Sequence, residues 1–216
     1  MARLLISSRN YSSWSLRGFL LVRLSGLACT IEALGSDDPD ARRELLLRAS
    51  SIRIPRLEHD GLKVWDTLAI AEYLNETFPD AAMLPSDRAA RAHCRSLCGE
   101  MHAGFTALRG SLPMNLKAHR PGFPVWSGAQ SDIDRITEMW RDCLATHGGP
   151  WLFGTRRTTA DAMFAPVATR ILTYDVKLDP ICTAYCRQIM TWPDMAEWVA
   201  EALVEPEEIE ELEVEF

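Results

Sequence analysis

The sequence has no surplus of basic residues outside its acidic C-terminal end. It carries 23 lysines and arginines against 30 acidic residues, a formal net charge of −7. Residues 201–216 hold eight glutamates and no basic residue, so the first 200 residues carry 22 acidic and 23 basic side chains, a net of +1. A nearly neutral body argues against general binding to the phosphate backbone, and we expect no nucleic-acid partner.

Long apolar runs and paired cysteines are also missing. No stretch of about 18 apolar residues occurs, so no transmembrane helix and no membrane partner are predicted. The run Leu4–Ile6 near the start is too short for the core of a secretion signal. The six cysteines include no CxxC pair, and we interpret them as reduced core residues of a cytoplasmic protein. Because 47% of the residues are hydrophobic, the acidic end does not indicate a disordered chain.

The first 80 residues alternate between strand and helix patterns. Short apolar or alternating runs predict strands at residues 4–6, 27–34, 53–58 and 62–65. Apolar residues at helical spacing predict helices that follow Ser12-Ser13, Asp38-Pro39 and Asp66-Thr67. The order β-α-β-α-β-β-α predicts a small α/β domain over residues 1–79.

The rest of the chain shows helical patterns only. Residues 79–85 read as a linker, and residues 87–118 form one long helical pattern. Capping boxes predict two further helix starts, one at Ser131 with Asp134 and one at Thr158 with Asp161. Two short helices are expected near 180–190 and 193–204, before an acidic extension. The predicted fold is therefore α/β plus all-α, with an all-helical domain over residues 86–216.

Three motifs in this order resemble the glutathione transferase superfamily. The first is the YSSWSLR stretch, Tyr11–Arg17, which is similar to the start of serine-type members of the zeta class. The second runs from Ile54-Pro55 to Asp66-Thr67 and on to Leu74, and the third is the Thr158–Asp161 box. The resemblance covers essentially the whole chain, and its nearest match is a bacterial zeta/theta-like serine-type member. It implies a thioredoxin-like N-terminal domain, a helical-bundle C-terminal domain and glutathione as co-substrate.

A glutathione transferase has to stabilise the thiolate of its co-substrate, since a free thiol is mostly protonated at neutral pH. A hydroxyl at the N-terminus of a helix can donate a hydrogen bond to sulfur, and the helix dipole favours the anion. Ser12 and Ser13 both stand at such a place, and the resemblance leaves open which of them is catalytic. Each could instead be an ordinary helix cap. Trp14 occupies the position of the zeta-class cysteine, which argues against thiol–disulfide exchange there.

The resemblance also implies a set of glutathione-binding residues. Pro55 would follow a cis peptide bond, and the backbone of Ile54 would pair with the cysteinyl part of glutathione. Asp66 and Thr67 open a helix whose N-terminus would hold the γ-glutamyl carboxylate, although both residues suit a plain cap. Arg53 would meet a glutathione carboxylate or else remain a solvated arginine.

An acceptor-substrate pocket would lie against the helical domain. The resemblance assigns it Tyr11, Met101, His102, Phe105 and Arg109, with core packing as the alternative. Cys94, Cys98 and His102 follow one another at four-residue spacing on one helical face, which suits packing and not a tetrahedral metal site. We therefore predict no bound metal.

The sequence thus predicts a glutathione transferase-like enzyme that activates the glutathione thiolate for attack on a small electrophile. A maleylacetoacetate-type isomerase and a non-catalytic glutathione-binding module remain alternatives, because fold does not fix function. We expect a homodimer with no prosthetic group. The extension 206–216 is expected to pack loosely, without a part in glutathione binding.

Overall fold

The computed structural model describes residues 1–34 and 53–206, and all structural statements concern these ranges. The N-terminal half contains β1 (Ala2–Ile6), α1 (Ser13–Ser25), β2 (Cys29–Ala33), β3 (Arg56–His59), β4 (Leu62–Trp65) and α3 (Thr67–Thr77). The helix predicted after Asp38-Pro39 lies outside the described residues. The four strands form one sheet in the order β2-β1-β3-β4, in which β2 is parallel to β1 while β3 is antiparallel to both of its neighbours.

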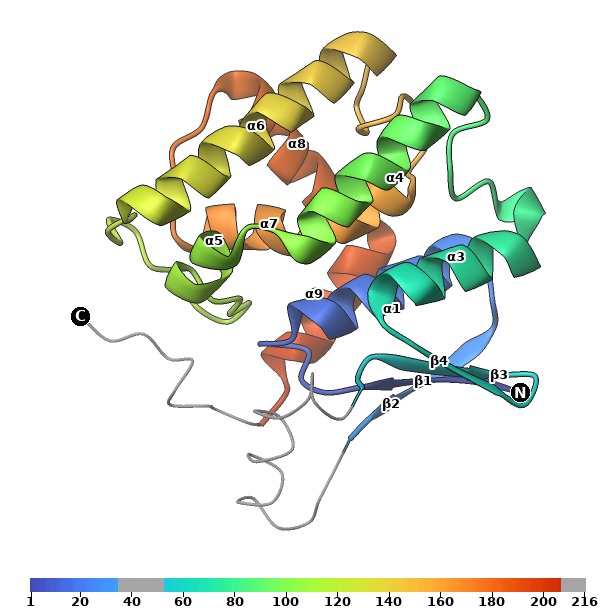
Figure 1. The fold of residues 1–216 in the computed structure, drawn as a ribbon. Helices are drawn as coiled ribbons and strands as arrows, with labels where there is room; N and C mark the ends of the chain where they lie inside the picture. Colours follow the sequence, from blue (N-terminus) through green and yellow to red (C-terminus); the bar gives the residue numbers. More distant parts are fainter. Residues whose placement is uncertain (35–52, 207–216) are drawn as a thin grey trace.

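Helices α1 and α3 cover the face of this sheet that is turned toward the C-terminal helices (Figure 1). Leu4 of β1 pairs with Ile31 of β2 and with Leu57 of β3, and this register aligns apolar side chains across the three strands. Helix α1 begins after the cap Ser12 and ends at Gly26, whose φ of 74° suits a glycine. The predicted thioredoxin-like order of elements is therefore confirmed in the described residues.

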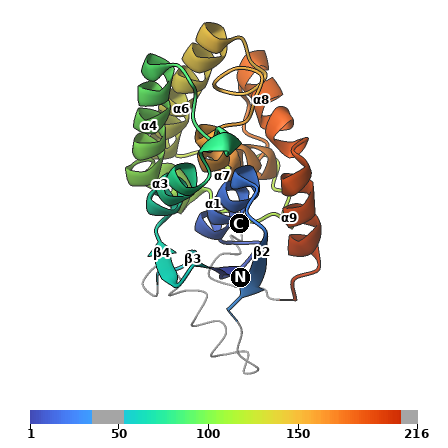
Figure 2. The same ribbon diagram turned by 90° about the vertical axis from the view of Figure 1, so that its right-hand side faces the viewer.

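The C-terminal half is helical throughout. It contains the 3₁₀ turn η1 (Pro79–Ala81), α4 (Arg88–Ala103), α5 (Thr106–Ser111), α6 (Ser127–His147), α7 (Thr159–Thr173), α8 (Pro180–Met190) and α9 (Pro193–Leu203). Helix α7 is the central one: it contacts α1, α4 and α8, and nearly all of its residues are buried. Figure 2 shows α1 and α3 between the sheet and the C-terminal helices. None of the helices in the described ranges has the length and apolar content that a bilayer span requires.

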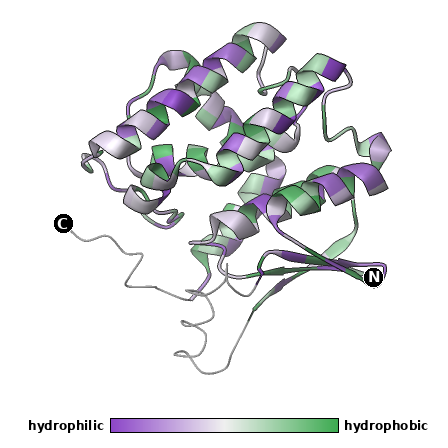
Figure 3. Ribbon diagram, viewed as in Figure 1, coloured by the Kyte–Doolittle hydropathy of each residue, from purple (hydrophilic) through white to green (hydrophobic). Residues whose placement is uncertain are grey.

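One hydrophobic core joins the two halves. It runs from Leu4 in the sheet through Leu16 and Phe19 of α1 to Phe164 of α7 and Trp198 of α9. Hydrophobic residues cluster along the inner helices, whereas the outer side of α6 carries hydrophilic ones (Figure 3). The site described next draws its residues from elements that share this core.

Two of the sequence predictions for the helical half are wrong in detail. The pattern over 87–118 does not form one helix, because the chain breaks at Gly104-Phe105, where Phe105 has a φ of 58°. A side chain at position 104 would also meet the carbonyl of Glu100 at 2.8 Å. Ser131 does not cap a helix: α6 begins four residues earlier, and the Ser131 hydroxyl donates to the carbonyl of Ser127. The predicted capping box of Thr158 and Asp161 is confirmed, and it forms the start of α7.

Candidate functional site

A hollow of about 320 Å³ lies where the α/β half meets the end of α4. Its lining consists of Trp14, Arg53, Ile54, Pro55, Trp65, Asp66, Thr67 and His102. All five residues expected to bind glutathione are therefore brought together, with one residue expected for the acceptor pocket. Larger hollows of about 440 and 460 Å³ lie at the β3–β4 hairpin and between α1, α8 and α9, and neither contains a predicted site residue.

The corner before β3 forms one wall of the hollow. The peptide bond between Ile54 and Pro55 is cis, and Arg53 has a positive φ of 63°. Pro55 packs against α1 at Gly18, where a Cβ atom would come within 2.9 Å of the proline ring. The exposed guanidinium of Arg53 lies over the Trp65 ring, 4.6 Å from its centroid. This stacking restrains the arginine at the rim of the hollow, where it can meet an anion.

The start of α3 forms the opposite wall. Asp66 caps the helix through Oδ1, which accepts hydrogen bonds from the amides of Leu68 (2.8 Å) and Ala69 (3.3 Å). Its other oxygen, Oδ2, lies 3.1 Å from Nε2 of His102. Thr67 is 1% exposed, and its hydroxyl lies 3.4 Å from Nδ1 of the same imidazole. The helix start thus offers a carboxylate, a hydroxyl and the positive end of a dipole within one small space.

The two serines predicted to be catalytic lie at the start of α1. Ser12 caps the helix: its Oγ accepts from the amide of Ser15 at 3.2 Å and donates to the Ser15 hydroxyl at 3.0 Å. Ser13 is the first residue of the helix and is 8% exposed. The lining of the hollow includes their neighbour Trp14 and neither serine. The cap interpretation therefore holds for Ser12, and a catalytic role for either serine stays a prediction.

Trp14 is contacted by two guanidinium groups and one imidazole ring. The guanidinium of Arg17 lies 4.6 Å from the indole centroid and that of Arg109 lies 5.2 Å away, while the His102 ring is 5.1 Å distant. Arg17 is fully buried, and its Nε donates to the carbonyl of Met163 at 2.7 Å. Burial, together with the nearby Arg170 and Arg109, holds the pKa of Arg17 well below its usual range. Through Trp14 the hollow therefore lies next to the guanidinium groups of Arg17 and Arg109, and Arg53 lines it directly, which favours an anionic ligand.

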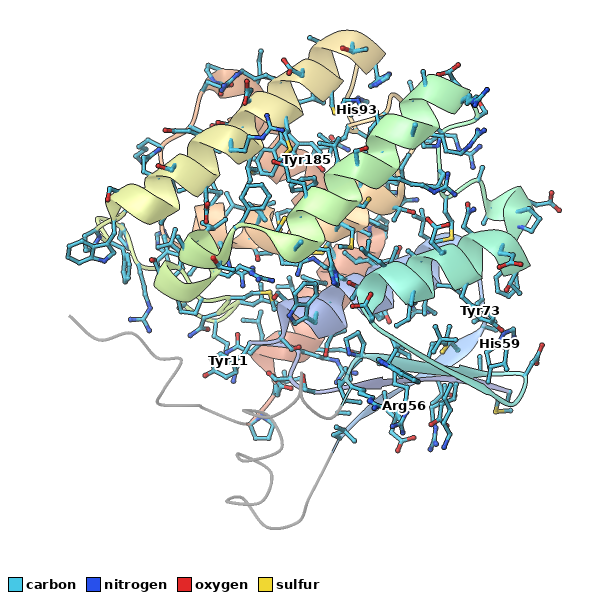
Figure 4. The ribbon with its side chains drawn as sticks, in the orientation of Figure 1. Tyr11, Arg56, His59, Tyr73, His93 and Tyr185 are labelled. Carbon is cyan, nitrogen blue, oxygen red and sulfur yellow. The ribbon has the colours of Figure 1, made fainter. Side chains whose placement is uncertain are left out.

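The residues predicted for the acceptor pocket do not all meet. His102 and Arg109 both contact Trp14, and their role in an acceptor pocket stays a prediction. Met101 is fully buried and Phe105 is 8% exposed, and both belong to the hydrophobic core. Tyr11 is also 8% exposed and lies at the junction of the sheet with the helices, far from the paired His59 and Tyr73 (Figure 4).

The protein's own thiols are poorly suited to nucleophilic chemistry. All six cysteines are free, and five of them are buried. Burial raises the pKa of Cys143, Cys182 and Cys186 to about 12, so these thiols stay protonated at neutral pH. Within residues 1–34 and 53–206, no group of three or more potential ligands is arranged to hold a metal ion. A reactive thiolate at this site would therefore have to belong to a bound ligand and not to one of these cysteines.

Sequence reasoning missed Trp65 and Arg17 as parts of the site and noted Trp14 only for the cysteine that it replaces. Trp14 follows directly after the two serines, and Trp65 directly precedes Asp66, so proximity to the motifs was the available signal. Arg17 closes the Tyr11–Arg17 motif and follows Trp14 by three residues on α1, so the i,i+3 spacing was the available signal for their stacking.

Comparison with known proteins agrees with this geometry. Residues 11–77 match the family model for the glutathione S-transferase N-terminal domain. A probable maleylacetoacetate isomerase of Caenorhabditis elegans is 26% identical over 81% of this chain and 81% of its own length. The maleylacetoacetate isomerase of Rattus norvegicus is 28% identical, but the match spans 61% of this chain and only 59% of that protein.

Solved structures extend the likeness to nearly the whole chain. A glutathione transferase homolog from Burkholderia GL BGR1, solved with bound glutathione, has a TM-score of 0.68 at 23% identity and covers 93% of this chain and 97% of its own. A maleylacetoacetate isomerase from Anaeromyxobacter dehalogenans 2CP-1 has a TM-score of 0.68 at 21% identity, with coverage of 97% and 95%. Identities this low establish the fold alone.

The family model covers every residue that lines the hollow except His102, and the fold continues through the helical half. The relatives that match in sequence are largely maleylacetoacetate isomerases, which are zeta-class transferases. Residues 11–77 thus match the glutathione S-transferase N-terminal domain, and over most of its length the chain is similar to maleylacetoacetate isomerases in sequence and to glutathione transferases in fold.

Proposed function

We propose that this protein is a glutathione transferase-like enzyme that activates the glutathione thiol for attack on a small electrophile. The observation that carries the proposal is the hollow in which Ile54, cis Pro55, Asp66 and Thr67 meet beside the start of α1. This arrangement joins a strand-like backbone edge to a helix N-terminus. A short peptide with a charged amino-acid head suits both surfaces.

Each part of glutathione has a counterpart in the hollow. The backbone of Ile54 would pair with the cysteinyl unit, as an added strand pairs with a sheet edge. The γ-glutamyl head carries an ammonium group and a carboxylate, which suit Asp66 and the Thr67 end of α3 respectively. Arg53, held over Trp65, would meet the second carboxylate. Glutathione acts here as co-substrate, and no prosthetic group is proposed.

The cysteinyl sulfur would then lie toward the N-terminus of α1. A hydroxyl of Ser12 or Ser13 would donate a hydrogen bond to the thiolate, and the cations beside Trp14 would lower the energy of the anion. The thiol proton leaves to water. The sulfur then forms a bond to an electrophilic carbon of the acceptor, whose leaving group departs with the bonding electron pair.

Isomerisation of the maleylacetoacetate type is a second candidate, and the names of the sequence relatives favour it. In that reaction sulfur adds to a cis double bond, the new single bond rotates, and elimination returns glutathione. Both reactions need the same activated thiolate. If the protein binds glutathione but does not activate its thiolate, it is a non-catalytic binding module.

We further propose that the protein is a cytoplasmic homodimer. Exposed apolar side chains on both halves support association, among them Leu62 at 53% and Trp126 at 64% exposure. Six free cysteines agree with a reducing compartment. Light scattering coupled to gel filtration measures the oligomeric state, and a monomer at micromolar concentration would contradict the dimer.

Replacing the serines tests the proposed function directly. We expect either Ser12→Ala or Ser13→Ala to lower kcat/KM for an aromatic electrophile about 100-fold, because the thiolate loses a hydrogen-bond donor. Retention on immobilised glutathione should persist, since the peptide contacts lie elsewhere. Ser96→Ala makes the same chemical change at an exposed site on α4 and should leave turnover unchanged.

The possible outcomes separate the three functions. Glutathione binding without turnover of any electrophile would leave a binding module. Turnover of maleylacetoacetate but not of the aromatic electrophile would select the isomerase. Failure of the wild-type protein to bind glutathione would overturn the assignment of the hollow.

A further inference from the structure

The carboxylate of Glu205, just after α9, is bound by the loop between β1 and α1. Its Oε1 accepts a hydrogen bond from the amide of Arg9 at 2.9 Å. Its Oε2 accepts from the amide of Asn10 at 2.8 Å and from the Ser8 hydroxyl at 2.7 Å. Three donors from consecutive residues thus converge on one carboxylate that lies about 195 positions away in the sequence.

Ser8 connects Glu205 to the start of α1 through further hydrogen bonds. Its hydroxyl oxygen accepts from the amide of Tyr11 at 3.1 Å, and its carbonyl accepts from the amide of Ser12 at 3.3 Å. Ser8 is 1% exposed, so its hydroxyl has no access to bulk water as an alternative partner. Orientation of this one serine by Glu205 therefore restrains the amides of the two residues that precede Ser13.

The same loop is tied to its surroundings by further contacts, which leave the carboxylate of Glu205 in a fixed place. The indole of Trp198 donates to the carbonyl of Arg9 at 3.0 Å. The ammonium of Lys117 donates to the backbone carbonyl of Glu205 itself. Asn10, which is fully buried, accepts through its side-chain oxygen from the amides of Leu116 (2.7 Å) and Lys117 (3.0 Å).

The distribution of charge also favours the contact between Glu205 and the loop that joins β1 to α1. Arg9 forms an ion pair with Glu201 through Nε at 2.5 Å, so its guanidinium neutralises the acid one turn before Glu205. The carboxylate of Glu205 instead receives uncharged donors, two of them backbone amides. Backbone amides hold fixed directions, so such contacts specify the shape of the loop more closely than a flexible ion pair would.

We propose that Glu205 is a positioning residue that acts through Ser8 to set the serine at the start of α1 against the glutathione sulfur. The inference rests on the proposed function, because it assigns the loop a role in thiol activation. It also gives the first glutamate after α9 a function distinct from that of the extension that follows. Glutathione binding itself does not involve Glu205, since the lining of the hollow in the described residues contains no part of the loop 8–10.

Point variants of the full-length protein test this role. We expect Glu205→Ala to lower kcat at saturating glutathione about tenfold and to raise the pKa of the bound glutathione thiol by about 1, measured by thiolate absorbance against pH. The Kd of glutathione, measured by calorimetry, should change less than twofold. Amide hydrogen exchange at Arg9, Asn10 and Ser12 should accelerate at least tenfold, while exchange in α7 should not.

A conservative variant and a control make the result specific. In Glu205→Gln the amide oxygen can take the place of Oε2 and keep the hydrogen bonds from Ser8 and Asn10, so only the acceptor for the Arg9 amide is lost and kcat should stay within about threefold of wild type. Glu197→Ala removes a carboxylate on α9 that pairs with Arg23 and should behave as wild type.

Failure of this inference is distinguishable from failure of the proposed function. A wild-type protein without glutathione turnover would defeat the proposed function. Turnover in the wild type together with an unchanged kcat and thiol pKa in Glu205→Ala would overturn the positioning role. Parallel losses of kcat, glutathione affinity and α7 protection would overturn it as well, because they would mark Glu205 as a general structural residue.

Discussion

Asp161 is a fully buried carboxylate whose oxygens accept four hydrogen bonds. Oδ1 accepts from the Leu152 amide at 3.1 Å and from the Tyr185 hydroxyl at 3.0 Å. Oδ2 accepts from the amide and the hydroxyl of Thr158, at 2.8 and 3.2 Å. Burial raises the pKa of this carboxyl, while the hydrogen bonds oppose the rise. Tyr185 lies inside the helical half, so this contact links α7 to α8 (Figure 4).

Replacing Asp161 should therefore cost far more than replacing an exposed cap. We expect Asp161→Ala to lower the free energy of unfolding by about 3 kcal/mol, because four buried donor groups lose their acceptor. Asp87→Ala is the matched control: its exposed carboxylate caps α4 with a single bond from Ala90, at 2.8 Å, and its loss should cost about 1 kcal/mol. Urea unfolding measures both values, and equal costs would contradict the role assigned to burial.

Individual site residues were predictable where a local motif required them. Pro55 and Asp66 lie together in the hollow, as the family resemblance implied, and the motifs that carry this resemblance consist of a few adjacent residues. Glu205 was not predictable in this way. Its three partners precede it by about 195 positions, and nothing near it in sequence indicates them. Contacts between distant segments depend on packing that a single sequence does not display.

At the scale of elements, the contact of α1 with the corner before β3 decides the shape of the hollow. Gly18 lies in the middle of α1, where glycine is unfavourable by roughly 0.5–1 kcal/mol relative to alanine. A Cβ atom there would come within 2.9 Å of Pro55 Cβ and 3.0 Å of its Cγ. The glycine therefore allows the helix and the proline to touch.

Gly18→Ala should separate these two elements. We expect the free energy of unfolding to fall by about 1–3 kcal/mol through overpacking, and the Kd of glutathione to rise severalfold as Ile54 shifts. Gly99→Ala makes the same change in α4 at a site with no atom within 4 Å, and it should stabilise the protein by about 0.5–1 kcal/mol. Denaturant unfolding and calorimetry with glutathione test the pair, and the same sign of effect in both variants would refute the packing argument.

Element types were easier to predict than element boundaries. The strands and helices near the motifs formed as expected, since their patterns were short and clearly bounded. The break at Gly104-Phe105 was missed because the apolar spacing continues across it, while the backbone of Phe105 is left-handed and leaves the helix. Ser131 was mistaken for a cap because a serine four residues into a helix can also donate back to a carbonyl, here that of Ser127.

At the scale of the whole molecule, the two halves share contacts that neither could form alone. The Phe19 ring of α1 lies 4.9 Å from that of Trp198 in α9. Arg17 of α1 donates to the carbonyl of Met163 in α7 at 2.7 Å. The division at residues 79–86 stays a prediction, and it separates elements of one continuous core.

A shared core predicts a single unfolding transition despite the two-part architecture. At one protein concentration we expect the calorimetric and van't Hoff enthalpies to agree, and far-UV and near-UV circular dichroism to give the same midpoint. Phe19→Ala sharpens the test, because it removes a ring from the α/β half that packs on Trp198 of the helical half. It should lower stability by about 3–5 kcal/mol and move the whole transition without dividing it. Two separable transitions, with only one shifted by Phe19→Ala, would show that the halves unfold independently and that their contact is a weak interface.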